Sequence, residues 1–153
     1  HIANVMKTFT GVEHRLENVA IIKDVTYIND SKATNLDSVS VAIQSFNKPV
    51  VLILGGRNKG ADFRLLLPHI KSSQVRDIIS YGEAGGQIST AIGDAVRSVQ
   101  VTDLNSAVTT AQRLAAPGDV VLLSPGCASF DQFANFEERG QYFKTKVMEM
   151  MAA

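Results

Sequence analysis

Hydrophobic residues in this chain fall into short, mostly continuous runs that alternate with amphipathic segments. Six runs rich in β-branched residues have the length of strands, at 18–23, 25–28, 49–54, 75–81, 96–101 and 119–123. Between most of them, apolar residues recur at helical spacing, as in the set Val39, Ala42, Ile43 and Phe46. Continuous apolar strands separated by helices are typical of a mainly parallel sheet with helices on both faces. The pattern therefore predicts an α/β fold with about six strands.

The first two runs are too close together for a crossover connection. Only Asp24 separates 18–23 from 25–28, whereas parallel strands need a connection of a dozen or more residues. This pair is expected to form an antiparallel hairpin that supplies one edge strand. Residues 1–10 carry no comparable pattern and are predicted to be a linker or the end of an upstream domain, which leaves 11–153 as one domain.

Two later segments carry signals for helix ends. Apolar spacing continues over 104–115, and Asp103 stands where an N-cap is expected. A longer helix is predicted at the C-terminal end, with a break near Gly140. Ser129 and Gln132 fit a capping box for that helix.

Composition narrows the class of protein but not its function. With 153 residues, 45% hydrophobic and 20% charged, the chain can form an ordinary globular domain with a core. Fifteen basic residues balance fifteen acidic ones, and the longest apolar run, 50–54, is too short to span a bilayer. We therefore expect no nucleic-acid partner and no membrane partner. A single cysteine, Cys127, excludes an internal disulfide and favours a cytoplasmic location.

Three polar segments follow predicted strands directly. They are N-D-S-K-A-T-N at 29–35, G-G-R-N-K-G-A-D-F at 55–63 and S-P-G-C-A-S-F-D-Q-F-A-N-F at 124–136. The carboxyl ends of parallel strands meet at one edge of a sheet, where free amides and helix N-termini bind ligands. The three segments are therefore expected to line one site.

Other interpretations of these segments must be weighed. The spacing at 55–63 is close to that of a phosphate-binding P-loop, but Ala61-Asp62 replaces the Lys-Ser/Thr pair that such a loop needs. A tight turn would also explain Gly55-Gly56, and a solvated loop would explain Lys59, so both interpretations remain open. Cys127 has no histidine base in these segments and is not expected to be a nucleophile. The histidines lack metal-ligand spacing, and no metal site is predicted.

Four motifs, taken in order, resemble the Mur ligases: G-V-E-H-R-L-E, Y-I-N-D-S-K-A-T-N, L-G-G-R-N-K-G-A-D-F and L-L-S-P-G-C-A-S-F-D-Q-F-A-N-F-E-E-R-G. The resemblance runs over about 11–146, and N-D-S-K-A-T-N is its most specific block. Sister ligases and folylpolyglutamate synthases carry histidine-bearing blocks there. The chain is therefore most similar to the family member that adds D-glutamate.

The resemblance also implies that other domains belong to the functional protein. Full-length members have an N-terminal domain for the UDP-sugar, a central ATPase domain with G-K-T, and a C-terminal Rossmann-like domain. This chain matches only the last, and it contains no G-x-x-x-x-G-K-[ST] motif. The N-terminal and central domains are expected in the same full-length chain, and the isolated 153-residue chain is expected to be inactive.

The activity implied by the resemblance is ATP-dependent amide formation. D-glutamate is added to UDP-N-acetylmuramoyl-L-alanine during synthesis of peptidoglycan precursors, through an acyl phosphate that the amine of D-glutamate attacks. Catalysis of this kind depends on positioning and charge neutralisation rather than on a protein nucleophile. ATP and Mg²⁺ are the expected cofactors of the full-length enzyme, with the magnesium ligands outside this chain.

The resemblance assigns roles to individual positions. Arg15 is expected to reach the nucleotide phosphates when the domains close, and Asp30 to accept hydrogen bonds from the ribose hydroxyls. Lys32 is expected to face the phosphate region as a catalytic residue. Asn35 is expected to cap the following helix and Asn29 to brace the loop. The D-glutamate carboxylates are assigned to Thr34, Lys59 and Ser129, assisted by the backbone at Phe130 and Phe136.

Two alternative functions remain open. One is a sister ligase or folylpolyglutamate synthase that adds another amino acid, which the absence of a histidine from 29–35 disfavours. The other is a non-catalytic, nucleotide-binding Rossmann-like module. An upstream G-K-T domain in the same gene would distinguish a ligase from such a module.

Overall fold

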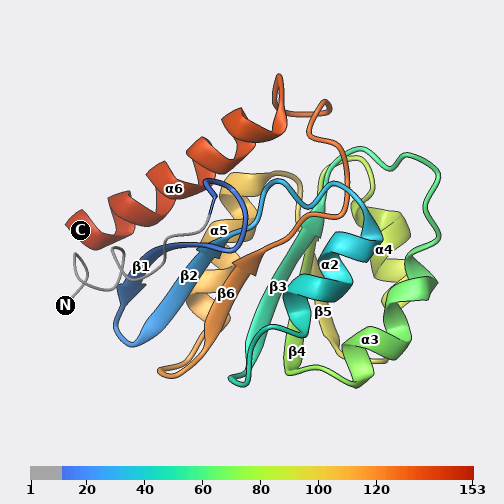
Figure 1. Ribbon diagram of the computed structural model, residues 1–153, viewed down its shortest axis with the longest axis horizontal. Helices are drawn as coiled ribbons and strands as arrows, with labels where there is room; N and C mark the ends of the chain where they lie inside the picture. Colours follow the sequence, from blue (N-terminus) through green and yellow to red (C-terminus); the bar gives the residue numbers. More distant parts are fainter. Residues whose placement is uncertain (1–11) are drawn as a thin grey trace.

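The computed structural model describes residues 12–153 and shows a six-stranded sheet between two layers of helices (Figure 1). The elements are, in chain order, β1 (Glu17–Ile22), β2 (Val25–Asn29), α2 (Leu36–Ile43), β3 (Val50–Gly55), η1 (Phe63–Leu66), α3 (Leu67–Lys71), β4 (Val75–Tyr81), α4 (Gly85–Ile92), β5 (Arg97–Gln100), α5 (Leu104–Leu114), β6 (Val120–Leu123) and α6 (Phe136–Ala152). The linker predicted for residues 1–10 lies outside the described part of the chain.

The strand order confirms the predicted mainly parallel sheet. The strands lie in the order β1-β2-β6-β3-β4-β5, and only β1 and β2 pair antiparallel. The hairpin turn places Lys23 and Asp24 at φ values of 51° and 63°. Two consecutive positive φ values are what a two-residue turn needs if its twist is to match that of the strands. The edge hairpin predicted from the short spacing is therefore present.

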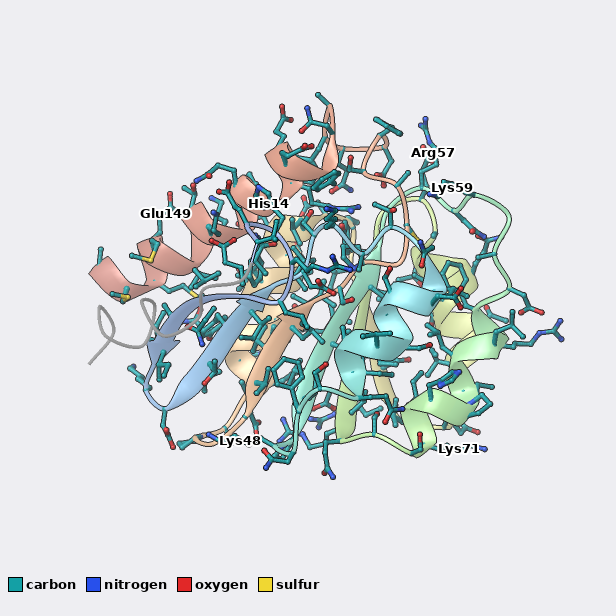
Figure 2. The ribbon with its side chains drawn as sticks, in the orientation of Figure 1. His14, Lys48, Arg57, Lys59, Lys71 and Glu149 are labelled. Carbon is teal, nitrogen blue, oxygen red and sulfur yellow. The ribbon has the colours of Figure 1, made fainter. Side chains whose placement is uncertain are left out.

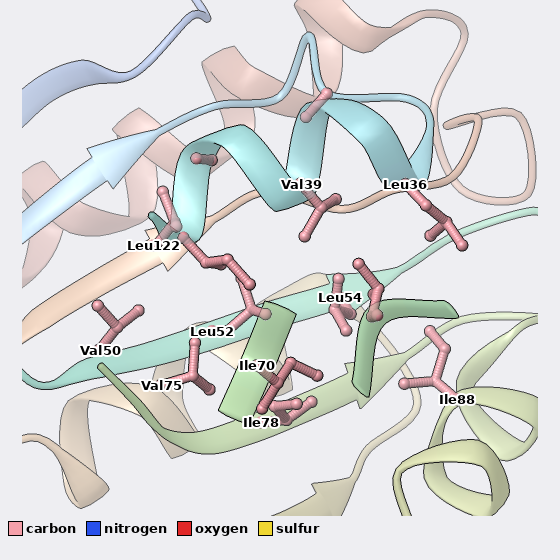
Figure 3. Packing of buried hydrophobic residues seen from close by; sticks show 14 of the residues in the cluster. Leu36, Val39, Val50, Leu52, Leu54, Ile70, Val75, Ile78, Ile88 and Leu122 are labelled. Atoms are coloured by element: carbon pink, nitrogen blue, oxygen red, sulfur yellow. The ribbon is translucent and has the colours of Figure 1, made fainter. Parts of the chain in front are cut away.

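Two hydrophobic cores lie on opposite faces of the sheet. On one face, α2, α3 and α4 pack against β3 and β4 through residues such as Val39, Ile70 and Ile88 (Figure 3). On the other face, α5 and α6 cover the sheet through residues such as Val108 and Phe143. Every residue of the central strand β3 is buried, because its alternating side chains enter both cores. This double burial explains why the run at 50–54 is continuously apolar.

Local helix signals were reliable where the capping group is close in sequence. Asp103 caps α5 by accepting a hydrogen bond from the Ser106 amide at 2.8 Å. Asn35 caps α2 in the same way, with a 2.9 Å bond from the Ser38 amide. Both predicted caps are confirmed. No specific prediction covered α4, which begins at Gly85 without a side-chain cap.

The predicted start of the C-terminal helix was wrong. The helix begins at Phe136, and Asn135 caps it by accepting a hydrogen bond from the Glu138 amide at 2.8 Å. The Gln132 side chain is taken up elsewhere: it donates to the Thr102 carbonyl at 3.0 Å and also accepts from the Leu104 amide. Ser129 and Gln132 therefore form no capping box.

The predicted break near Gly140 is also wrong, because α6 is continuous through this residue. Gly140 is buried where the helix passes over the His14 ring, and a Cβ at this position would overlap that ring. A close approach, rather than a helix break, accounts for the glycine. None of the helices in residues 12–153 is long and apolar enough to cross a membrane.

Candidate functional site

Three polar loops leave neighbouring strands at the same edge of the sheet. We name them by the strand that each follows: the β2 loop (29–35), the β3 loop (55–63) and the β6 loop (124–136). In the sheet β6 lies between β2 and β3, and all three strands run in parallel. The prediction that these polar segments share one edge is confirmed.

Backbone hydrogen bonds join the three loops through the β6 loop. On one side, the Gly126 amide donates to the Ala33 carbonyl of the β2 loop at 2.8 Å. On the other side, Arg57 of the β3 loop exchanges two hydrogen bonds with Ala128, at 2.9 and 3.1 Å. The edge is therefore a connected surface and not a set of independent solvated loops.

The glycine pair of the β3 loop allows this close approach. Gly56 has a φ of 121°, and a Cβ there would overlap the Ala128 carbonyl oxygen. A larger residue would therefore be strained and would also push the β6 loop away. A Cβ on Gly55 would instead overlap Tyr81 at the end of β4. The amides of both glycines donate to carbonyls, those of Pro125 and Tyr81, which distinguishes this loop from one that cradles phosphate with free amides.

Asp30 presents a buried carboxylate at the start of the β2 loop. It is 4% exposed, and its oxygens accept hydrogen bonds from the Leu16 amide at 3.0 Å and the Ser124 hydroxyl at 2.8 Å. Burial raises the pKa of Asp30 to about 6, against the opposing effects of these two hydrogen bonds and of the Arg15 charge. At neutral pH it is therefore mainly ionised, and each oxygen keeps capacity for a further donor.

A cavity of about 380 Å³ opens beside Asp30. Its lining comprises Arg15, Leu16, Asp30, Lys32, Ala33, Asn35, Asp37, Ser38, Val41 and Ala42. Arg15 and Lys32 are exposed cations, while Leu16, Val41 and Ala42 provide apolar surface. The structure thus brings Arg15 and Asp30, which were predicted to bind the nucleotide, together with Lys32, which was predicted to face the phosphate region. A carboxylate acceptor, two cations and an apolar wall match the ribose, phosphates and base of such a ligand.

The residues predicted to bind the amino acid are placed differently. Ser129 is buried, Thr34 is half-buried and Lys59 is exposed. Phe130 is 61% exposed, and the Phe136 carbonyl already accepts a 2.7 Å hydrogen bond from the Ser31 hydroxyl. None of these five residues lines the cavity beside Asp30.

The loop contacts nevertheless bring these groups to one edge. Thr34 directly follows Ala33, and Ser129 directly follows Ala128, and both preceding residues take part in the loop-joining hydrogen bonds. Lys59 extends from the β3 loop at the end of the molecule opposite Lys48 and Lys71 (Figure 2). Two hydroxyls, of which that of Ser129 is buried, and one ammonium thus lie on three joined loops. We call this part of the edge the donor-rich surface, and donors of these kinds suit carboxylates.

Asn29 braces the β2 loop as predicted. Its side-chain oxygen accepts from the Ser31 amide at 3.1 Å, and its amide nitrogen contacts His14 Nδ1 and Glu17 at 2.9 and 3.0 Å. The side chain is fully buried, so its whole hydrogen-bonding capacity serves the protein.

One cluster has potential metal ligands that the sequence analysis did not group. Glu13, His14 and Glu17 bring ligand atoms within 4.8 Å of one another. However, the Lys144 ammonium lies 2.6 Å from Glu13 and 3.1 Å from Glu17, where it already pairs with both carboxylates. These contacts make the cluster a poor fit for a metal ion, since binding would require displacing the lysine. That magnesium ligands come from other domains stays a prediction.

Sequence reasoning missed two side chains that organise the site. Ser124 donates to Asp30 across the sheet edge. Arg139 is fully buried and donates to the Ser31 hydroxyl, the Ser31 carbonyl and the Cys127 carbonyl at 2.9, 2.7 and 2.9 Å. Arg139 is the arginine of the R-G pair that ends the last motif, but no neighbouring residue in the sequence indicated its hydrogen-bond partners.

Comparison with known proteins places this arrangement in context. A family profile described as "Mur ligase, glutamate ligase domain" matches residues 14–127. A UDP-N-acetylmuramoylalanine–D-glutamate ligase from Chlamydia caviae is 48% identical over 147 residues, which are 96% of this chain and 35% of the relative. The ligase of the same name from Salinibacter ruber is 45% identical over 151 residues, covering 98% of this chain and 33% of the relative. The chain therefore spans about a third of the length of the curated relatives it matches.

Solved structures show the same fold at low sequence identity. The UDP-N-acetylmuramate-alanine ligase of Thermotoga maritima superposes with a TM-score of 0.62 at 12% identity, over 96% of this chain and 33% of that one. The bifunctional folylpolyglutamate synthase/dihydrofolate synthase of Yersinia pestis gives a TM-score of 0.62 at 19% identity, over 94% and 32%. At these identities the likeness concerns the fold alone.

Proposed function

The chain belongs to the Mur ligase family, and on that premise we propose that it is the amino-acid-binding domain of an ATP-dependent ligase that joins D-glutamate to UDP-N-acetylmuramoyl-L-alanine. The observation that carries the proposal is the connected loop edge, which pairs the cavity beside Asp30 with a donor-rich surface. Relatives bearing the D-glutamate ligase name match nearly the whole of this chain, which supports the choice of substrate.

The cavity beside Asp30 is proposed to take part of ATP when the domains close. The ionised Asp30 carboxylate accepts hydrogen bonds from the ribose hydroxyls, a task that acids perform in other nucleotide-binding folds. Arg15 and Lys32 are long, exposed cations on the lining, and phosphate oxygens are their natural partners. Lys32 faces the phosphate region, where neutralising negative charge lowers the barrier to phosphoryl and acyl transfer.

The donor-rich surface is proposed to hold D-glutamate. Its two carboxylates are bound by the Lys59 ammonium and the hydroxyls of Thr34 and Ser129, with backbone groups at Phe130 and Phe136. The N–H of Phe136 is the first of α6, and helix N-termini favour anions. Bound in this way, the amino group is free to attack an activated carboxylate.

The reaction needs no nucleophile from this domain. ATP supplies the phosphoryl group that activates the muramoyl-alanine carboxylate, and the amine of D-glutamate is the attacking group. Burial raises the pKa of the Cys127 thiol to about 12, which keeps it protonated and unreactive. The contribution of this chain is orientation of D-glutamate and charge neutralisation. The sugar-nucleotide-binding and central ATPase domains, with Mg²⁺, belong to the rest of the full-length protein.

Steady-state kinetics of the full-length protein test the proposal. Phosphate release should depend on ATP, UDP-N-acetylmuramoyl-L-alanine and D-glutamate together, and L-glutamate or meso-diaminopimelate should not replace D-glutamate. Turnover with meso-diaminopimelate instead would identify a sister ligase, and binding without any turnover would identify a nucleotide-binding module. The 153-residue chain alone should neither hydrolyse ATP nor form the amide.

A further inference from the structure

Arg139 is a fully buried cation whose partners carry no formal charge. It is the largest of the fully buried side chains, and it forms no ion pair among residues 12–153. Its three hydrogen bonds go to two carbonyls and one hydroxyl. Burying a guanidinium without a direct ion pair carries a large desolvation cost, and burial lowers the pKa of Arg139 although the nearby Asp131 charge opposes this. An apolar side chain of similar volume would serve packing better. This cost suggests a role beyond stability.

The partners of Arg139 lie on different loops of the site. Nε and Nη2 donate to Ser31 of the β2 loop, and Nη1 donates to the Cys127 carbonyl of the β6 loop. The β3 loop also passes close by, since a Cβ built on Gly56 would lie 3.4 Å from Nη1. One planar group therefore lies at the junction of all three loops. Its rigid fork fixes the direction of each bond as well as its length.

These anchoring points lie close in sequence to the residues proposed to bind D-glutamate. Ser31 precedes Thr34 by three residues, and Cys127 precedes Ser129 by two. Ser31 also adjoins Lys32, but the Lys32 amide has an anchor of its own, since it donates to the His14 carbonyl at 3.0 Å. Asp30, in contrast, is held independently, because its amide donates to the Leu123 carbonyl at 2.7 Å and its carboxylate accepts from Leu16 and Ser124. Loss of Arg139 would therefore loosen the amino-acid side of the site more than the nucleotide side.

We propose that Arg139 is a positioning residue that sets the separation of Thr34 and Ser129 for the two carboxylates of D-glutamate. The proposal rests on the function proposed above. Arg139 has no exposed surface and cannot touch the substrate itself. Its effect comes from holding both loops in the binding geometry before the substrate arrives, which lowers the ordering cost of binding.

The experiment is steady-state kinetics of the full-length ligase with Arg139→Lys. Lysine keeps the charge, but its ammonium donates from one point and cannot reproduce the fork that spans Ser31 and Cys127. The KM for D-glutamate should rise by about tenfold, while the KM for ATP stays within about twofold of the wild type. Ser31→Ala removes one of the contacts without leaving a buried charge unpaired, and it should shift the same KM in the same direction by less.

Val147→Ala is the matched control for lost stability. Val147 is buried on the same helix, about 12 Å further along at 1.5 Å per residue, and packs in the core instead of against the loops. The substitution should lower Tm and leave both KM values unchanged. A purely structural Arg139 would behave in the same way.

Three outcomes would overturn the proposal. The first is a wild-type KM for D-glutamate in a folded Arg139→Lys variant, and the second is an equal rise in both KM values. If Arg139→Lys does not fold, an unchanged KM in Ser31→Ala is the deciding negative result. The wild-type enzyme separates the two proposals. If it uses D-glutamate, the proposed function stands even where the Arg139 proposal fails. If it does not use D-glutamate, the proposed function and the Arg139 proposal are both overturned.

Discussion

Buried charged side chains are paired differently at the two ends of the sheet. At the amino end, Asp77 and Asp119 have side chains only 2% and 4% exposed, and each meets an arginine. Arg76 bridges them at 2.9 and 2.8 Å, and Arg97 makes a further ion pair with Asp77. Burial alone would raise the pKa of Asp77, but the hydrogen bonds and charges of Arg97 and Arg76 outweigh it and hold the pKa below its ordinary value.

At the carboxyl end, the buried charges have no such partners. Asp30 accepts hydrogen bonds only from neutral groups among residues 12–153, and burial raises its pKa to about 6. Arg139 donates only to neutral oxygens in the same part of the chain. The ion pairs at the amino end are satisfied within the fold, whereas buried charges without an ion pair, as at the carboxyl end, are typical of functional sites. This contrast favours the carboxyl end as the site, on grounds separate from the family resemblance.

The largest effect is expected from removing a cation at the carboxyl end. A charge-assisted hydrogen bond from Lys59 to a D-glutamate carboxylate is worth about 1.5–3 kcal/mol, so Lys59→Ala should lower kcat/KM for D-glutamate by about ten- to a hundredfold. Lys59→Arg should rescue poorly, because the wider planar fork would have to displace the loop. The measurement is kinetics of the full-length ligase with D-glutamate varied at saturating ATP.

Lys48→Ala is the matched control, since Lys48 is an exposed lysine at the amino end of the sheet (Figure 2). It should leave the kinetics unchanged. Wild-type kinetics in Lys59→Ala would mean that Lys59 is a solvated loop residue.

A smaller effect, on stability alone, is expected at the amino end. Asp77→Asn removes the charge that two arginines contact, and we expect the free energy of unfolding to fall by about 2 kcal/mol. The loss stays below that of a fully buried pair because Arg97 is 60% exposed and can be solvated. Urea denaturation of the chain measures it. Glu149→Gln, which alters an exposed pair with Lys146, should change stability by less than about 0.5 kcal/mol. Equal losses in both variants would contradict the distinction between the two ends.

At the carboxyl end of the sheet, Asp30 and Thr34 of the β2 loop should affect the KM of different substrates. Asp30→Ala removes the acceptor proposed for the ribose hydroxyls and should raise the KM for ATP by about tenfold, with little change for D-glutamate. Thr34→Ala should show the reverse preference. Both variants are compared in the full-length enzyme with each substrate varied in turn. The proposed division fails if each variant affects both substrates equally.

The smallest effect expected is a pH dependence. With a pKa of about 6, Asp30 is mostly protonated below that value, and a protonated carboxyl loses acceptor capacity for ribose hydroxyls. The KM for ATP should therefore be about fourfold higher at pH 5.5 than at pH 7.5, following the ionised fraction. Asp30→Asn should have a higher KM that no longer varies over this range. A wild-type profile that is flat between these pH values would argue against an Asp30 contact.

The pH dependence of the free energy of unfolding should have opposite signs for the Asp30 and Asp77 contributions. Folded Asp30 takes up its proton near pH 6 and the unfolded chain does so only near 3.8, so the Asp30 contribution to stability grows as pH falls through this window. Asp77 has a lowered pKa, and its contribution is present above its unfolded value and is lost as pH falls through the folded one. Urea denaturation of Asp30→Asn between about pH 7 and 4, and of Asp77→Asn from about pH 5 down to about pH 3, would reveal opposite slopes relative to the wild type.

The sequence by itself determined the layout of the sheet and its loops. Burial on both faces requires continuous apolar strands, and the single residue between the first two runs permits only a hairpin. Asn35 and Asp103 were predictable as caps because each binds an amide three residues away. The position of Asp30 in a loop at the carboxyl edge also followed from the sequence, since it stands directly after a strand and within the most specific family motif.

Tertiary structure alone decided which polar groups are used within the fold. Gln132 fits a local capping box in the sequence. In the structure its side chain forms hydrogen bonds with Thr102 and Leu104 instead, about 30 residues away. The hydrogen bonds from Ser124 to Asp30 and from Arg139 to Ser31 span 94 and 108 residues, and no residue spacing in the sequence predicts them. Hydrophobic periodicity records which face of an element is buried, whereas the partner of a buried polar group depends on which distant loops the completed sheet brings together.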